Sequence, residues 1–200
     1  MKYWILDGGS NDGALVDGGY PKSKIKNWRY HAGEPLAKEY PEDAAVGFSK
    51  KWPARRELRD FLDNSVSILI VSSRVRAILE KLKAKDLEFL PLLVKDHKGK
   101  PVPQSYFFLN PLGGQDAVDV KASDVVMDKL FKDRIRHFNT LVLNPKGIEK
   151  EAKLFRLSRA RDVILVDDSV RKTFQKEGIT GCRYYKAEGW NGLPIGNEEG

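Results

Sequence analysis

The sequence contains a single cysteine and no hydrophobic run long enough to span a membrane. Because Cys182 has no second thiol to pair with, an intrachain disulfide is excluded and a reducing compartment is expected. The opening residues, MKYWILDGGSNDG, include too few apolar side chains before Asp7 to form a signal peptide. These features predict a cytoplasmic protein that does not enter a membrane.

Motifs of known catalytic or metal sites are also scarce. The histidines, His31, His97 and His137, lie in unrelated segments, and none has a second ligand at a recognised metal spacing. Cys182 has neither a histidine nor a helix amino terminus beside it, which favours a buried small residue over a nucleophile. No serine elbow or glycine-rich phosphate loop is present. The sequence therefore predicts no metal and no cofactor.

Positive charge is in modest excess, with 35 Lys and Arg against 28 Asp and Glu, a formal net charge of +7. The basic residues mostly alternate with acidic ones, as in KLFKDRIRH and RELRDFLD, which is typical of a solvated surface. None of the recognised nucleic-acid modules is present. A basic nucleic-acid-binding module remains an alternative, but the pattern makes nucleic acid an unlikely partner.

Apolar periodicity predicts an α+β fold with a mixed sheet. One domain is expected over 1–190, with an irregular, proline-interrupted part at 1–60, a core at 61–190 and a mobile tail at 191–200. Trp28 and Trp52 of the irregular part are expected to be packed. The predicted strands are 3–6, 67–73, 87–94, 105–111, 139–145, 153–158, 163–166 and 182–186, and the predicted helices are 55–62, 73–85, 123–136 and one from about 168 to 177.

One stretch, DVILVDDSVRKTF at 162–174, has the appearance of an enzyme site. An apolar strand runs into Asp167 and Asp168 and then into a helix, and paired carboxylates at the end of a buried strand can hold Mg²⁺. The corresponding hypothesis is a magnesium-dependent phosphotransfer or hydrolytic enzyme that uses Asp167 and Asp168.

An internal similarity weakens this hypothesis. A constant shift of 95 residues aligns ILIVSSRVRAILEK, from Ile68, with VILVDDSVRKTFQK, from Val163, and predicts two similar strand-helix-strand units. Ser72 and Ser73 then stand where the second unit has the two aspartates. Serine and aspartate both cap helices by accepting backbone N–H bonds, whereas a hydroxyl replaces a carboxylate poorly on Mg²⁺. Capping therefore explains both units, and catalysis only one.

The order of several motifs resembles a known family. ILIVSSRVRAILEKL, LEFLPL, YFFLNPLGGQDAVDVKASDV, LVLNP, LFRL and VILVDDSVRKTFQKEGITGCRY are similar, in this order, to the immunity proteins of bacterial polymorphic toxin systems, in a family formerly catalogued as a domain of unknown function. With weaker cues at NWR and GEPL, the resemblance covers about Asn27 to Tyr185. It does not separate this family from its sister immunity families, and the acidic pair departs from the serine-type junction expected there.

The resemblance implies a cytoplasmic, non-catalytic protein that binds and neutralises a cognate toxin encoded by a neighbouring gene. Such a protein needs no cofactor and no catalytic residue, but a complementary surface, typically with aromatic and arginine anchors. The resemblance assigns no partner-binding residues, and it is compatible with a homo-oligomer. Because the chain is basic, charge steering favours a neutral or acidic toxin.

Overall fold

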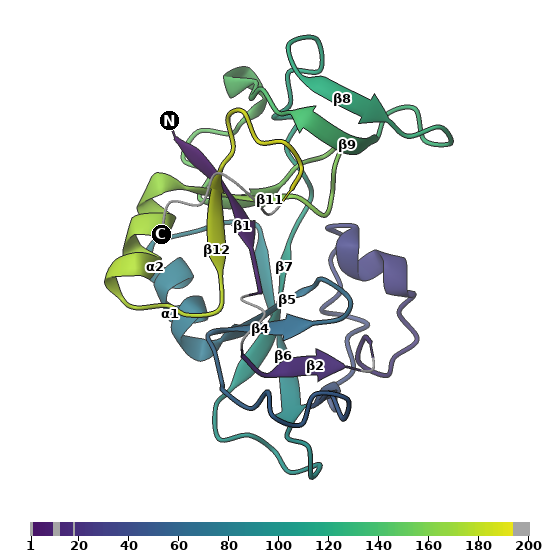
Figure 1. Cartoon of the computed structure of the whole chain (residues 1–200), viewed down its shortest axis with the longest axis vertical. Helices are drawn as coiled ribbons and strands as arrows, with labels where there is room; N and C mark the ends of the chain where they lie inside the picture. The colour runs from purple at the N-terminus through teal and green to yellow at the C-terminus, as the bar shows by residue number, and fades with distance from the viewer. Residues whose placement is uncertain (1, 10–12, 18, 194–200) are drawn as a thin grey trace.

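The computed structural model describes residues 2–9, 13–17 and 19–193. It has an α+β architecture dominated by strands, which form a four-stranded sheet, a closed six-stranded barrel and a two-stranded hairpin (Figure 1). Within these ranges, no helix is both long enough and apolar enough to cross a membrane.

The four-stranded sheet is antiparallel and buried on both faces. Its strands in spatial order are β10 (Leu154–Arg156), β11 (Ile164–Asp167), β1 (Tyr3–Asp7) and β12 (Arg183–Lys186). Along β1, Trp4 and Leu6 enter one hydrophobic core and Tyr3 and Ile5 enter another, as the alternation of side chains in a strand requires. The strand predicted at 3–6 is thus confirmed as β1, an inner strand of this sheet, within an N-terminal part otherwise predicted to be irregular.

The barrel closes in the order β2 (Leu15–Asp17), β3 (Ala45–Phe48), β6 (Leu87–Lys95), β7 (Tyr106–Pro111), β5 (Leu69–Ser72) and β4 (Phe61–Asn64). The β2–β4 and β3–β6 pairs are parallel and the others antiparallel. Ile70 and Phe108 point into the barrel, while Val71 and Leu109 join the core outside it. Because β5 and β7 are buried on both faces, their sequences are continuous apolar runs rather than alternating ones.

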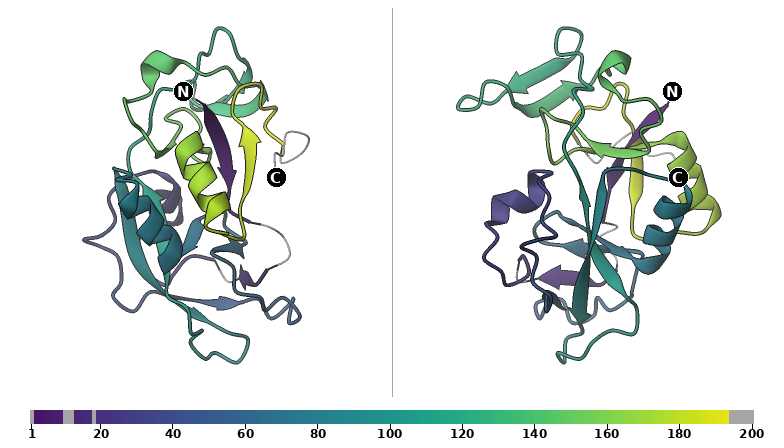
Figure 2. Two further views of the ribbon diagram at one scale, coloured as in Figure 1. Left: turned by 90° about the vertical axis from the view of Figure 1, so that its left-hand side faces the viewer. Right: turned by 180° about the vertical axis from the view of Figure 1, so that it is seen from behind.

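The two α-helices, α1 (Ser73–Lys81) and α2 (Asp168–Lys176), pack against each other on one side of the molecule (Figure 2, left). Val75 and Leu79 of α1 and Val170 and Phe174 of α2 share a core with the sheet and the outer face of the barrel. The bounds of β5 and α1 recur in β11 and α2 at the offset of the sequence similarity. That the two units are copies stays a prediction.

A long hairpin extends from the other face of the sheet. It consists of β8 (Asp124–Met127) and β9 (Ile135–Thr140), and Ile135 and Phe138 anchor it in the core on that face. Two short 3₁₀ helices complete the described elements, η1 (Asn27–His31) and η2 (Pro145–Gly147).

Several sequence predictions need correction. The helix predicted at 123–136 is wrong, because this segment is the β8–β9 hairpin. The helix predicted at 55–62 is also wrong, because residues 55–60 are not helical and β4 begins at Phe61. The two predicted units do not share one mixed sheet: β5 and β6 belong to the barrel, whereas β11 and β12 belong to the antiparallel sheet. Residues 194–200 of the predicted mobile tail lie outside the described residues.

Candidate functional site

Asp167 caps the amino terminus of α2. Its carboxylate accepts the backbone N–H of Val170 at 2.9 Å and the Lys153 ammonium at 2.8 Å. Its backbone, at φ −74° and ψ 164°, has the extended geometry of a capping residue. The sequence-predicted cap is therefore present, and the carboxylate is held by groups of the chain itself.

Asp168 lies in the first turn of α2 and faces three donors. Lys172 Nζ lies 2.8 Å from its carboxylate, Trp4 Nε1 3.0 Å and Arg171 Nη2 3.2 Å. The hydrogen bonds from Lys172, Trp4 and Arg171 lower the pKa of Asp168 to about 2. The Arg171 guanidinium also lies 3.9 Å from the Trp4 ring centroid, so Asp168 belongs to a network that fixes α2 on the sheet.

The matching junction at α1 contains a residue that the sequence did not indicate. Ser72 accepts the backbone N–H of Val75 at 3.4 Å, and its hydroxyl donates to Asp60 at 2.6 Å. Asp60 is buried and also accepts bonds from Arg74 and from the Thr180 backbone. The carboxylate therefore joins α1 to the loop before β12. At both junctions the polar groups hold backbone and neighbouring side chains.

Cys182 is largely buried, and the three histidines lie in two different parts of the fold. Burial raises the pKa of the Cys182 thiol to about 12, so the thiol stays protonated near neutral pH. His97 packs edge-on to Phe48 of the barrel, but His31 and His137, expected in unrelated places, line the same groove. In the part of the chain that the structure describes, no group of three or more His, Cys, Asp or Glu could hold a metal.

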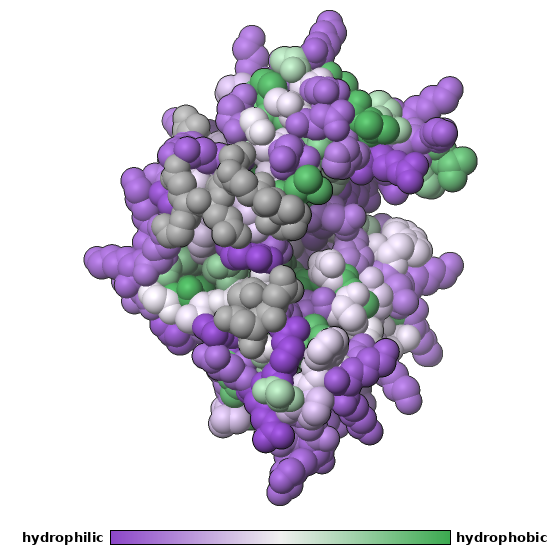
Figure 3. Space-filling view, viewed as in Figure 1, coloured by the Kyte–Doolittle hydropathy of each residue, from purple (hydrophilic) through white to green (hydrophobic). Residues whose placement is uncertain are grey.

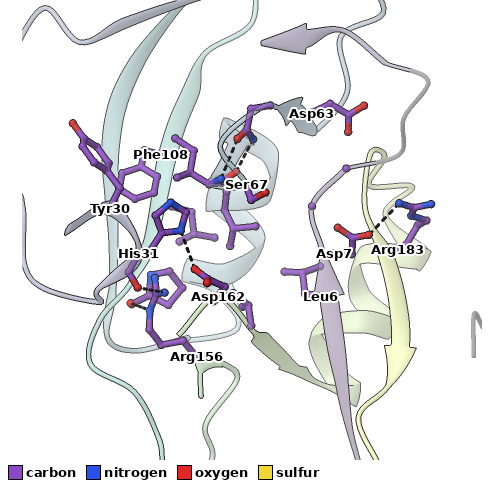
Figure 4. A pocket seen from close by; sticks show the side chains of 18 of the residues that line it. Leu6, Asp7, Tyr30, His31, Asp63, Ser67, Phe108, Arg156, Asp162 and Arg183 are labelled. Carbon is purple, nitrogen blue, oxygen red and sulfur yellow. Dashed lines mark hydrogen bonds and ion pairs between the residues drawn. The ribbon is translucent and has the colours of Figure 1, made fainter. Parts of the chain in front are cut away.

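A cavity of about 280 Å³ lies where the barrel meets the sheet (Figure 4). Each of its carboxylates has a partner in the chain: Asp162 lies 3.1 Å from His31, Asp7 lies 3.0 Å from Arg183, and Asp63 pairs with Arg55. The hydrogen bond from His31 lowers the pKa of Asp162. Because these carboxylates already have partners within the chain, the cavity offers a ligand little free carboxylate.

A larger groove, with a cavity volume of about 620 Å³, lies between η1 and the β8–β9 hairpin. Figure 3 shows it as a notch in the surface below the hairpin, which carries hydrophobic residues at its far end. The residues after β10 form its floor. Its charged and aromatic lining includes Trp28, His31, Arg134, Arg136, Arg159 and Arg161.

The η1 wall of the groove is fixed from behind. Arg156 of β10 is buried and donates to the carbonyls of His31 at 2.9 Å and Pro111 at 2.8 Å. Gly33 has φ +70°, and a Cβ there would lie 2.3 Å from the Gly113 carbonyl oxygen, so only glycine allows this close approach. The chain after η1 is thus held against the end of β7.

Sequence reasoning missed this groove. Trp28 and Trp52, expected to be packed, are 60% and 57% exposed, and Trp28 lines the groove. The basic stretch KLFKDRIRH was interpreted as solvated surface, yet the fold brings its Arg134 and Arg136 to the groove beside Arg159 and Arg161. Exposed tryptophan together with arginine is typical of the centre of a protein-binding surface.

Comparison with known proteins supports a protein-binding role. Residues 7–189, nearly the whole chain, match the sequence model of the immunity protein family (Imm11). The comparison with curated proteins returned no match. The matched range includes the barrel, both α-helices, η1 and the β8–β9 hairpin, but only the last residue of β1. On this match, the chain belongs to the Imm11 family of immunity proteins.

Proposed function

We propose that this protein neutralises a cognate bacterial toxin in the cytoplasm by binding it, without catalysing a reaction. The observation that carries the proposal is the family match over residues 7–189. We expect the toxin to be encoded by a neighbouring gene, and the complex to be tight enough to protect the cell that makes both proteins.

The contacts of Asp167 and Asp168 support the proposal that the protein does not act as an enzyme. Asp167 is occupied by the Val170 backbone and Lys153, and Asp168 by Trp4, Arg171 and Lys172. A magnesium site would have to displace these cations and the cap, at a cost to the stability of α2. Structural use of the pair is therefore the simpler account of its geometry.

A protection assay separates binding from catalysis. The toxin domain encoded beside this gene is expressed in a sensitive host together with either the wild-type protein or Asp167→Asn/Asp168→Asn. Asparagine can still cap α2 and accept the Trp4 bond, but it is a much weaker ligand for Mg²⁺. We expect full protection by the double variant, measured as colony counts after toxin induction.

The control for this assay is the fold of the double variant. Its circular dichroism and melting temperature are compared with those of the wild type. Loss of protection by a variant that remains folded would contradict the binding proposal and favour chemistry at the acidic pair.

A further inference from the structure

The end of the β8–β9 hairpin presents apolar side chains to solvent. Leu130 is 86% exposed, Phe131 51% and Val126 47%. The turn is held in shape by Asp128, whose carboxylate accepts the backbone N–H groups of Leu130 at 2.8 Å and Phe131 at 2.9 Å. An ordered turn that exposes large apolar side chains is typical of an interaction site, because ordering in advance lowers the entropic cost of binding.

The groove beside this turn contains arginines without acidic partners. Among the described residues, no carboxylate lies within ion-pairing distance of Arg134, Arg136 or Arg161, whereas Arg159 pairs with Asp116 at 2.8 Å. The Arg134 guanidinium instead lies 4.5 Å from the Phe131 ring centroid. The groove therefore has guanidinium groups with no carboxylate of the described residues in direct contact.

The acidic residues of the groove attract Arg134 and Arg136 only through space, without forming an ion pair with them. Asp128 is used by the two backbone amides of the turn, which lower its pKa, and Asp162 is used by His31. The Asp128 carboxylate thus points to the hairpin turn, and the Asp162 carboxylate points to the His31 ring. A carboxylate from outside the chain would thus meet the arginines that lack an ion pair, and these donate only one hydrogen bond within the described residues, from Arg161 to the Ala32 carbonyl at 3.2 Å.

We infer that the groove between η1 and the β8–β9 hairpin binds an acidic segment of the toxin. Carboxylates of that segment pair with Arg134, Arg136 and Arg161, and an apolar side chain next to them packs against Leu130 and Phe131. This inference rests on the proposed function and names the surface and the partner chemistry for it. Arginine suits this use because its planar fork binds a carboxylate through two parallel bonds.

The exposed aliphatic side chains of this surface favour a protein partner over a nucleic acid. The groove has rings and arginines that suit base stacking and phosphate contacts, but Leu130 and Val126 beside it are exposed aliphatic groups that contribute to neither. An apolar contact surrounded by charged groups is instead the arrangement of a protein interface, with a desolvated centre and a polar rim.

A matched pair of charge reversals tests the inference. Arg134→Glu/Arg136→Glu alters the groove, and Arg56→Glu/Lys98→Glu alters two exposed basic residues that do not line it. Both variants change the net charge by the same amount, so they differ only in position. Binding to the neighbouring gene's toxin domain, made harmless by an inactivating substitution, is measured by calorimetry. We expect the groove variant to lose affinity on the order of 100-fold and the control less than about threefold.

The apolar part of the surface has its own matched pair. Leu130→Ser removes the exposed leucine of the turn, and Leu93→Ser removes a leucine of β6 that is 44% exposed on the barrel. We expect about a tenfold loss of affinity for Leu130→Ser and little change for Leu93→Ser.

The outcomes separate the inference from the proposed function. If the wild-type protein does not bind the toxin domain, the proposed function is wrong and the groove assignment fails with it. If the wild type binds and Arg134→Glu/Arg136→Glu binds equally well while folded, only the groove assignment is wrong. An equal loss of affinity in both charge variants would contradict the groove assignment and show that only the overall charge of the protein matters. Groove-dependent binding of labelled DNA or RNA oligonucleotides, without toxin binding, would assign the groove to nucleic acid.

Discussion

At the scale of single residues, Arg156 does the most to connect parts of the molecule that are far apart in sequence. Its guanidinium donates to carbonyls of His31, Pro111 and Arg161, and so joins β10 to η1 and to the end of β7. Burial lowers the pKa of Arg156 to about 10, which still leaves it charged near neutral pH. An arginine inside the apolar run LFRL was the available signal for this role.

Replacing Arg156 should therefore destabilise the whole fold. Arg156→Met keeps much of the side-chain length but leaves three carbonyl acceptors without their donor, at about 1 kcal/mol each. We expect the free energy of unfolding to fall by about 3 kcal/mol in urea titrations. Arg56→Met, at an exposed arginine, should change it by less than about 0.5 kcal/mol. Equal midpoints for the two variants would show that Arg156 is not a structural joint.

At the scale of elements, local signals were sufficient for α1 and α2 but not for the β8–β9 hairpin. Both helices follow a buried strand, have a capping residue and carry apolar residues at helical spacing, and all three features act within one turn. In the hairpin, Val126, Leu130 and Phe131 have the same helical spacing, yet they are exposed. Apolar periodicity indicates a helix only when the apolar face is buried, and these three side chains are on the surface instead.

The barrel was beyond the reach of local signals. Its closure depends on β2 pairing with β4 and β3 pairing with β6, so each contact joins a short strand to one that is far away in the sequence. β2 has three residues and β3 has four, too few to show a clear period. The apolar strands β5, β6 and β7 were predicted, but nothing in them specifies that the sheet they form closes on itself.

Acid unfolding tests the network at the amino terminus of α2. The pKa of Asp168 is about 2 in the folded protein, below the ordinary value of 3.8, so its contribution to stability is present above about pH 4 and is lost as the pH falls toward 2. Asp168→Asn has no charge to titrate. We expect the stability of this variant, from urea midpoints, to fall less steeply than that of the wild type over this range.

The control for this prediction is Asp124→Asn. Asp124 is exposed on β8, and its side chain has no hydrogen bond within the described ranges. The control should follow the wild-type pH profile. If Asp168→Asn follows it too, the ion pairs of Asp168 do not persist in solution.

At the scale of the whole molecule, the fold assembles one surface from segments that are distant in the sequence. η1 comes from near residue 30, the hairpin from 124–140 and the groove floor from the residues after β10 (Figure 1). A sequence can show that arginines and tryptophans are present, but only this arrangement puts Trp28 opposite the arginines of the hairpin. The excess of positive charge, which looked dispersed along the chain, has a local concentration here.

The central claim, neutralisation by binding, is tested most directly by titrating a fixed amount of the toxin domain with this protein. Residual toxin activity is followed as a function of the molar ratio, and the toxin is then recovered in denaturant and weighed by mass spectrometry. Our account predicts a linear fall in activity to zero at a fixed small-integer ratio, with toxin of unchanged mass. Inactivation of excess toxin by a small fraction of an equivalent, or a toxin of altered mass, would contradict it.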